Sequence, residues 1–215
     1  IALAPFQARH LFGESVPARE LGLDWGADCQ VYLPPCLSAY VGADITCGLL
    51  ACDILHARGP ALLADVGTNG EMALLSDGTI YCCATAAGPA FEGVGISCGS
   101  AAVTGAIDAV TVENNALRCH VIGGVDTLLL AAGRAASEVE TVWLAGGFGC
   151  KLSRDSAGAV GLLPRQLIPA VRPSGNTAAM GAALLLCSRR FEAETVSIAA
   201  AARLVDLSAS PVFQQ

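Results

Sequence analysis

Asp65-Val66-Gly67-Thr68-Asn69-Gly70-Glu71 is the stretch that decides the fold, because apolar runs flank it on both sides. The run Ala61 to Val66 has the length and flanks of a buried strand, and Glu71 to Ser76 predicts a second strand. Asp77-Gly78 is a typical hairpin turn, so a third strand is expected from Thr79 to Thr85. The sequence therefore predicts a sheet that begins with three antiparallel strands.

Helices and strands alternate downstream of these strands. We expect a helix from about Gly99 to Val110, a strand near Leu117 to Ile122, a helix from Val125 to Ser137, a strand from Thr141 to Ala145, a helix from Asn176 to Arg190 and a last strand near Thr195 to Ile198. The main order, β-β-β-α-β-α-β-α, predicts an α/β fold with a mixed sheet flanked by helices. This order resembles the ribonuclease-H-like unit from which actin-like ATPases and sugar kinases are built.

The region upstream of the strands is less regular. Residues 1–40 contain four prolines and little periodicity, so we expect a lead-in segment there and one domain over residues 41–215. Within the lead-in, Ala18 to Leu23 could form a helix. Asp44 can cap a further helix that runs to about Ala57.

The composition excludes several classes of protein. Hydrophobic residues make up 53% of the 215 residues and charged residues 14%, which excludes a disordered chain. A net charge of −7 argues against non-specific binding of nucleic acid. The longest uncharged stretch, Pro173 to Ser188, has 16 residues and is too short and polar to cross a membrane. We therefore expect a soluble protein.

The ten cysteines contain no C-x-x-C pair, so neither a zinc site nor an iron–sulfur cluster is expected in this chain. Their scattered positions favour reduced, buried thiols in a cytoplasmic protein. Because the first residue is Ile1 and not Met, we expect the chain to be part of a longer protein.

The turn after the first buried strand carries the residues best suited to phosphate chemistry. The backbone N–H groups of Gly67, Thr68, Asn69 and Gly70 could converge on phosphate oxygens. Asp65, at the end of the incoming strand, could hold Mg²⁺ through water. The alternative is an ordinary hairpin in which Asn-Gly forms the turn.

Two further glycine-rich segments follow strands. Gly146 and Gly147 would let a flat ligand or a phosphate approach the backbone, or they form a plain strand-to-helix turn. In the segment that contains Gly88, Glu92 could accept a hydrogen bond from ribose hydroxyls or cap a helix. Segments that follow strands can gather at one sheet edge, where ligands bind.

Asp44 has two interpretations. It is a helix cap, or it faces the cleft as a general base for the group that attacks the γ-phosphate. His10, His56 and His120 are isolated from these motifs and are expected to be surface or satisfied residues.

Three blocks of sequence resemble a known family. They are Gly42-Ala43-Asp44-Ile45-Thr46, then Leu63 to Glu71, then Ala86-Ala87-Gly88-Pro89-Ala90-Phe91-Glu92-Gly93. Together they resemble the reductive activators of corrinoid proteins, which belong to the acetate and sugar kinase, Hsc70 and actin superfamily. Later segments from Leu144 to Gly149, Gly161 to Pro164 and Gly175 to Ala178 look similar to the same family.

The resemblance implies an ATPase-type activator that couples ATP to the return of an inactive Co(II) corrinoid to Co(I) for methyl transfer in anaerobic metabolism. It implies ATP and Mg²⁺ as cofactors, with Asp65 and residues 67–70 in the second phosphate loop. It places Gly146 and Gly147 on the adenosine side and makes Asp44 the catalytic carboxylate. The implied partner is a corrinoid protein.

The chain departs from the family pattern in two ways. No cysteine pattern for the ferredoxin-like iron–sulfur domain is present, and no first phosphate loop precedes Asp65. We therefore expect this chain to be the second lobe, with the first lobe and the ferredoxin-like domain upstream, and it could form a homodimer. The alternatives are a small-molecule kinase of the same superfamily and a non-catalytic interaction domain that keeps the fold.

Overall fold

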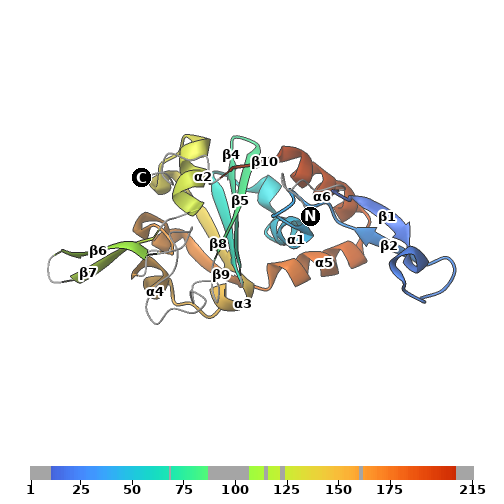
Figure 1. Ribbon diagram of the computed structural model, residues 1–215. Helices are drawn as coiled ribbons and strands as arrows, with labels where there is room; N and C mark the ends of the chain where they lie inside the picture. Colours follow the sequence, from blue (N-terminus) through green and yellow to red (C-terminus); the bar gives the residue numbers. More distant parts are fainter. Residues whose placement is uncertain are drawn as a thin grey trace.

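A six-stranded mixed sheet forms the centre of the fold (Figure 1). The computed structural model describes residues 11–67, 69–86, 107–113, 116–121, 124–159 and 162–206. In the sheet order β10-β5-β4-β3-β8-β9, β4 is antiparallel to both its neighbours and the remaining pairs are parallel. The strands are β3 (Ala61–Val66), β4 (Asn69–Ser76), β5 (Thr79–Ala86), β8 (Thr141–Ala145), β9 (Val171–Gly175) and β10 (Ala202–Leu204).

Helices cover both faces of this sheet, as Figure 1 shows. Leu62, Ala64 and Val66 of β3 point into one core with helix α2 (Gly124–Ala132) and the segment that holds α4 (Arg154–Ala159). Ala61 and Leu63 point into a second core, under α1, α5 and α6. These three helices span Ala43–Ala51, Thr177–Cys187 and Arg190–Ala201. The alternation of side chains along β3 thus separates a three-layer α/β/α domain into two cores.

The predicted strands of the central hairpins are confirmed. The strands expected at 61–66 and 141–145 are β3 and β8, and those expected at 71–76 and 79–85 lie within β4 and β5. Asp77 and Gly78 both have positive φ in the two-residue turn between β4 and β5. The predicted mixed α/β sheet flanked by helices is therefore present.

A second, separate sheet corrects two expectations. The strand expected near 117–122 is β7 (Ala116–Val121), but it pairs with β6 (Ile107–Glu113) and not with the central sheet. Residues 107–110, expected at the end of a helix, therefore belong to a strand, and the earlier part of that helix lies outside the described residues. The β-branched residues of 107–113 favour an extended backbone, which explains the change.

The C-terminal region also differs from expectation. The strand expected at 195–198 is wrong, because these residues lie in α6, where Thr195 and Ile198 are buried on one helix face. The strands that complete the sheet are β9 and the three-residue β10. Pro173 lies in β9, which is an edge strand, where the missing N–H is tolerated.

Two predicted helices are shorter than expected. The helix expected at 125–137 ends as α2 at Ala132, and Gly133 follows with a φ of 63°. The helix expected at 176–190 ends as α5 at Cys187, and α6 begins at Arg190. No helix among the described ranges is long and apolar enough to cross a membrane.

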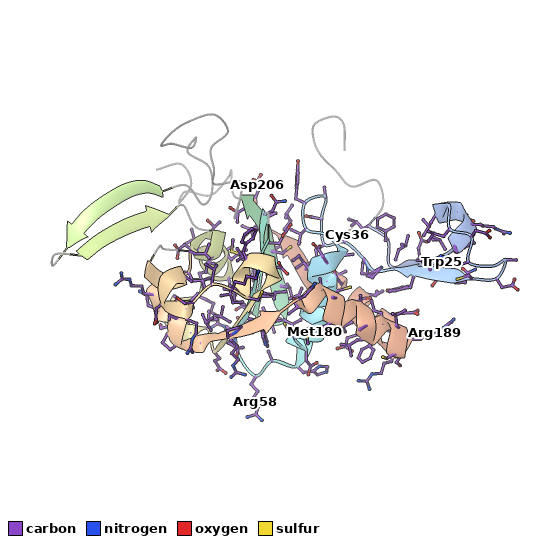
Figure 2. The ribbon with its side chains drawn as sticks, turned by 90° about the horizontal axis from the view of Figure 1, so that it is seen from below. Trp25, Cys36, Arg58, Met180, Arg189 and Asp206 are labelled. Atoms are coloured by element: carbon purple, nitrogen blue, oxygen red, sulfur yellow. The ribbon has the colours of Figure 1, made fainter. Side chains whose placement is uncertain are left out.

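The N-terminal segment is a two-stranded ribbon. Strands β1 (Glu14–Pro17) and β2 (Gln30–Leu33) pair antiparallel, and the helix expected at 18–23 is a single 3-10 turn at Ala18–Leu21. The ribbon extends away from the sheet, and Figure 2 shows Trp25 near its outer end. The Tyr32 hydroxyl lies 2.8 Å from Thr195 Oγ1 of α6, which fastens the ribbon to the domain.

Candidate functional site

The turn between β3 and β4 lies at the edge where the carboxyl ends of the parallel strands meet. Val66 pairs with Gly70, and the Gly67 N–H donates to the Asn69 carbonyl over 2.9 Å. Asn69 and Gly70 are therefore the first residues of β4, so the alternative of an Asn-Gly turn is wrong. Compared with an Asn-Gly turn, this pairing changes which residue of β4 lies opposite Asp65.

Asp65 and Glu71 face each other across β3 and β4. Their positions alternate in step with Leu63 and Ala73, so both side chains lie on the face that α1 covers. Burial and the negative charge of Asp44 raise the pKa of Asp65. Burial and the charges of Asp44 and Asp65 raise the pKa of Glu71 to about 7. Three carboxyl groups from α1, β3 and β4 thus interact at this edge.

Asp44 reaches this group from the first turn of α1. Its side chain is exposed, and its Oδ1 accepts a hydrogen bond from the Ile45 N–H over 2.9 Å. Gly42, not Asp44, is the N-cap residue of α1, and its side-chain-free position leaves room for the Asp44 carboxylate. The expected cap is therefore wrong, and the helix ends at Ala51 and not near Ala57.

Gly146 brings the end of β8 against the carboxylates. Its φ is 89°, and a methyl group there would overlap Asp65 Oδ1 and the Val66 carbonyl. Gly147, the next residue, has an ordinary φ, and no described atom lies within 4 Å of the place a methyl group would take. The two glycines begin the short helix α3 (Gly146–Gly149), so the glycines of this segment have different physical roles.

The neighbouring strand ends at the same edge. Ala145 of β8 pairs with Gly175 of β9, and α5 begins two residues later. The Asn176 side chain caps α5 by accepting a hydrogen bond from the Ala179 N–H over 2.9 Å. The structure thus places the ends of β3, β8 and β9 and the start of α1 around one point.

The sequence-predicted residues fall into two groups. Asp44, Asp65, Gly67, Asn69, Gly70, Gly146 and Gly147 lie at this edge, whereas Thr68, Gly88 and Glu92 lie outside the described residues. Sequence reasoning assigned no role to Glu71. A two-residue Asn-Gly turn would have put Leu74 opposite Asp65, so Glu71 could have been found only by considering the longer turn.

Comparison with known proteins identifies the family. A family model described as the C-terminal domain of RACo, the ASKHA domain, matches residues 59–126 and 119–215. A second model, of the RACo middle region, matches residues 1–57. The chain belongs to the RACo family. Membership of this family implies a nucleotide-binding ATPase fold.

This RACo-family chain is similar to two curated proteins and to one solved structure. It is 38% identical over 117 residues to the [Co(II) methylated amine-specific corrinoid protein] reductase of Methanosarcina barkeri, covering 54% of this chain and 20% of the relative. It is 36% identical over 123 residues to the corrinoid activation enzyme RamQ of Eubacterium limosum, covering 57% and 20%. A solved structure, of a reductive activator for corrinoid,iron-sulfur protein, matches with a TM-score of 0.76 at 26% identity.

The RACo-family chain is shorter than these relatives. The match to the solved structure covers 100% of this chain and 48% of the other, so the chain spans about half of that activator. The matched segments cover a fifth of each curated relative.

The acidic edge of the RACo-family chain fits a hard divalent cation. Mg²⁺ prefers oxygen ligands, and a cation stabilises carboxylates such as Asp65 and Glu71, whose pKa is raised by burial and by neighbouring negative charge. Asp65 is the most central of the three, because its carboxylate lies directly against Gly146 and its cross-strand neighbour is Glu71. The donor set is thus chemically suited to Mg²⁺.

The titration of Glu71 leads to a pH prediction. Its pKa is about 7 in the folded chain against an ordinary value of 4.5, so the folded state binds more protons than the unfolded state between these values. The free energy of unfolding should therefore fall as the pH rises from about 5 to about 7, and this contribution should be constant above that range.

Urea denaturation across this range measures the effect. Glu71→Gln should reduce the slope, whereas Glu20→Gln, at an exposed position of the ribbon, should leave it as in the parent chain. An unchanged slope in Glu71→Gln would show that another group causes the pH dependence.

Proposed function

We propose that this chain is the nucleotide-binding second lobe of an ATP-dependent reductive activator, which returns a corrinoid protein from Co(II) to Co(I). The observation that carries the proposal is the meeting of Asp44, Asp65 and Gly146 at one sheet edge in a chain of the RACo family. The names of the relatives support the corrinoid part, because each is named for corrinoid reduction or activation.

The residues of the edge would have separate roles toward ATP. Backbone N–H groups of the turn at 67–70, other than that of Gly67, which donates to the Asn69 carbonyl, would bind phosphate oxygens. The small Gly146 and Gly147 would let the nucleoside side approach the backbone. Asp65 would hold Mg²⁺ through water, and Mg²⁺ would neutralise phosphate charge when bound. Asp44, exposed at the first turn of α1, would accept the proton of the attacking water.

Reduction itself requires one electron for each cobalt. We propose that an iron–sulfur domain outside this chain supplies it, since Co(II) becomes Co(I) by gaining a single electron. ATP binding would close the two lobes and change how the activator docks on its corrinoid partner. The chain's residues would thus control docking, not electron transfer.

Reconstitution with a corrinoid protein tests the proposal. The activator that joins this chain to the first lobe is mixed with a Co(II) corrinoid protein, a low-potential chemical reductant and Mg-ATP. Co(I), followed by absorption, should accumulate only when Mg-ATP is present. ATP hydrolysis should rise on the order of tenfold when the corrinoid protein is added.

The same assay distinguishes the other functions. Hydrolysis that depends on a small hydroxylated acceptor and yields a phosphorylated product would favour the kinase and overturn the proposal. If calorimetry detects no binding of Mg-ATP, the non-catalytic interaction domain remains.

A further inference from the structure

The sheet edge that carries Asp44, Asp65 and Gly146 is called the nucleotide edge below. A cluster of three other side chains, those of Asp53, His56 and Glu194, lies away from it. Asp53 directly follows Cys52 after α1, His56 ends the 3-10 helix Ile54–His56, and Glu194 lies on α6. One ligand atom from each side chain lies within 4.8 Å of the others. Residues about 140 positions apart in the sequence are thus brought together by packing.

Buried neighbours fix the elements that carry these side chains. Ile54, between Asp53 and His56, is 0% exposed, and Ile198, one helical turn after Glu194, is 1% exposed. Both belong to the same core, so the two elements that carry the cluster are fixed against each other. The cluster is therefore organised by the fold, although Asp53 and His56 themselves are exposed.

The cluster lies at the other end of α1 from Asp44. Asp44 lies in the first turn of α1, which ends seven residues later at Ala51, and a helix rises about 1.5 Å per residue, so the two ends are about 10 Å apart. The chain then enters β3 at Ala61, at the amino end of the strand whose carboxyl end carries Asp65. The cluster therefore lies toward the amino end of β3, and the nucleotide edge lies at its carboxyl end.

An imidazole with two carboxylates is a donor set for transition metals. Zn²⁺ binds His nitrogen and Asp or Glu oxygen at about 2.1 Å, whereas Mg²⁺ and Ca²⁺ prefer sites made only of oxygen. His56 Nδ1 and Asp53 Oδ1 lie 2.6 Å apart and share a hydrogen bond, which a cation would replace. A cation between them requires a separation of roughly 3.4 Å for tetrahedral geometry, which exposed side chains reach by small rotations.

The surroundings leave room for the cation and its water. A cavity of about 420 Å³ adjoins the cluster, lined by apolar residues of α1 and α5 together with Arg190 and Phe191. The Arg190 guanidinium lies over the Phe191 ring, 4.7 Å from its centre. The positive charge of Arg190 thus has an aromatic partner of its own.

We infer that Asp53, His56 and Glu194 bind a zinc-class divalent cation, which braces α6 against the end of α1. The three protein ligands leave a coordination position for water. This site is independent of the proposed corrinoid function and takes a metal of a different class from the nucleotide edge.

Calorimetric titration with Zn²⁺ tests the inference on the 215-residue chain. Exposed thiols are good zinc ligands, so Cys150 and Cys187, both exposed, are replaced by serine in every sample. This background should bind Zn²⁺ and gain melting temperature with it. His56→Ala and Glu194→Gln should each lower the affinity by about tenfold or more and lose the gain in melting temperature.

Glu192→Gln is the matched control, because it removes the same charge from the same turn of α6 without touching the cluster. Its Zn²⁺ affinity should equal that of the background. The inference is overturned if the background shows no saturable binding, or if His56→Ala and Glu194→Gln bind Zn²⁺ as tightly as Glu192→Gln. A thiolate charge-transfer band in the Co²⁺ complex that disappears in His56→Ala would also overturn it, since it would place a sulfur ligand at a cluster whose proposed ligands contain none.

Discussion

Asp65→Asn is expected to lower Mg²⁺-dependent affinity for ATP by about a hundredfold or more. The substitution keeps the shape of the side chain beside Gly146 and removes the negative charge that a cation needs. Because burial and the charge of Asp44 raise the pKa of Asp65, its negative charge is unfavourable without a cation beside it. The variant should therefore be at least as stable as the parent chain while binding ATP poorly.

Calorimetry on the activator that carries both lobes measures this effect, with Mg²⁺ present and then with the metal chelated. The parent should lose affinity when Mg²⁺ is removed, and Asp65→Asn should be weak in both conditions. Asp77→Asn is the control, since Asp77 lies in the turn at the opposite end of β4 and pairs with Arg134 over 2.7 Å. If Asp65→Asn keeps its Mg²⁺ dependence, the metal assignment to Asp65 is wrong.

Gly146→Ala is expected to lower the free energy of unfolding by about 3 kcal/mol, from steric overlap and from strain at positive φ. The added methyl group would overlap Asp65 Oδ1 and the Val66 carbonyl, and a φ of 89° is unfavourable for alanine. Relief requires β3 and β8 to separate where the site is formed. Urea denaturation measures the loss, and ATP affinity should fall with it.

Gly147→Ala provides the matched control for stability. It adds the same methyl group one residue later, where no described atom lies within 4 Å and φ is ordinary. Its free energy of unfolding should change by only about 0.5 kcal/mol. Equal losses in the two variants would mean that glycine flexibility, and not close contact with Asp65, explains both positions.

Local pattern was sufficient for the central strands. The runs at 61–66 and 141–145 are apolar and bounded by turn residues, so length and flanks alone predicted β3 and β8 to the residue. The same reasoning failed at 107–110 and 195–198, where short segments are compatible with both helix and strand. Packing decided the second of these, since Thr195 and Ile198 become buried only when α6 lies on the sheet.

The candidate site shows the same division. The sequence by itself determined that glycines and an aspartate follow buried strands, because the covalent order of residues places them at strand ends. Only the tertiary structure decided that Glu71 faces Asp65, since the register of a hairpin depends on the geometry of its turn. It also decided that Glu194 meets Asp53 and His56, because contacts across about 140 residues arise from the packing of helices on the sheet.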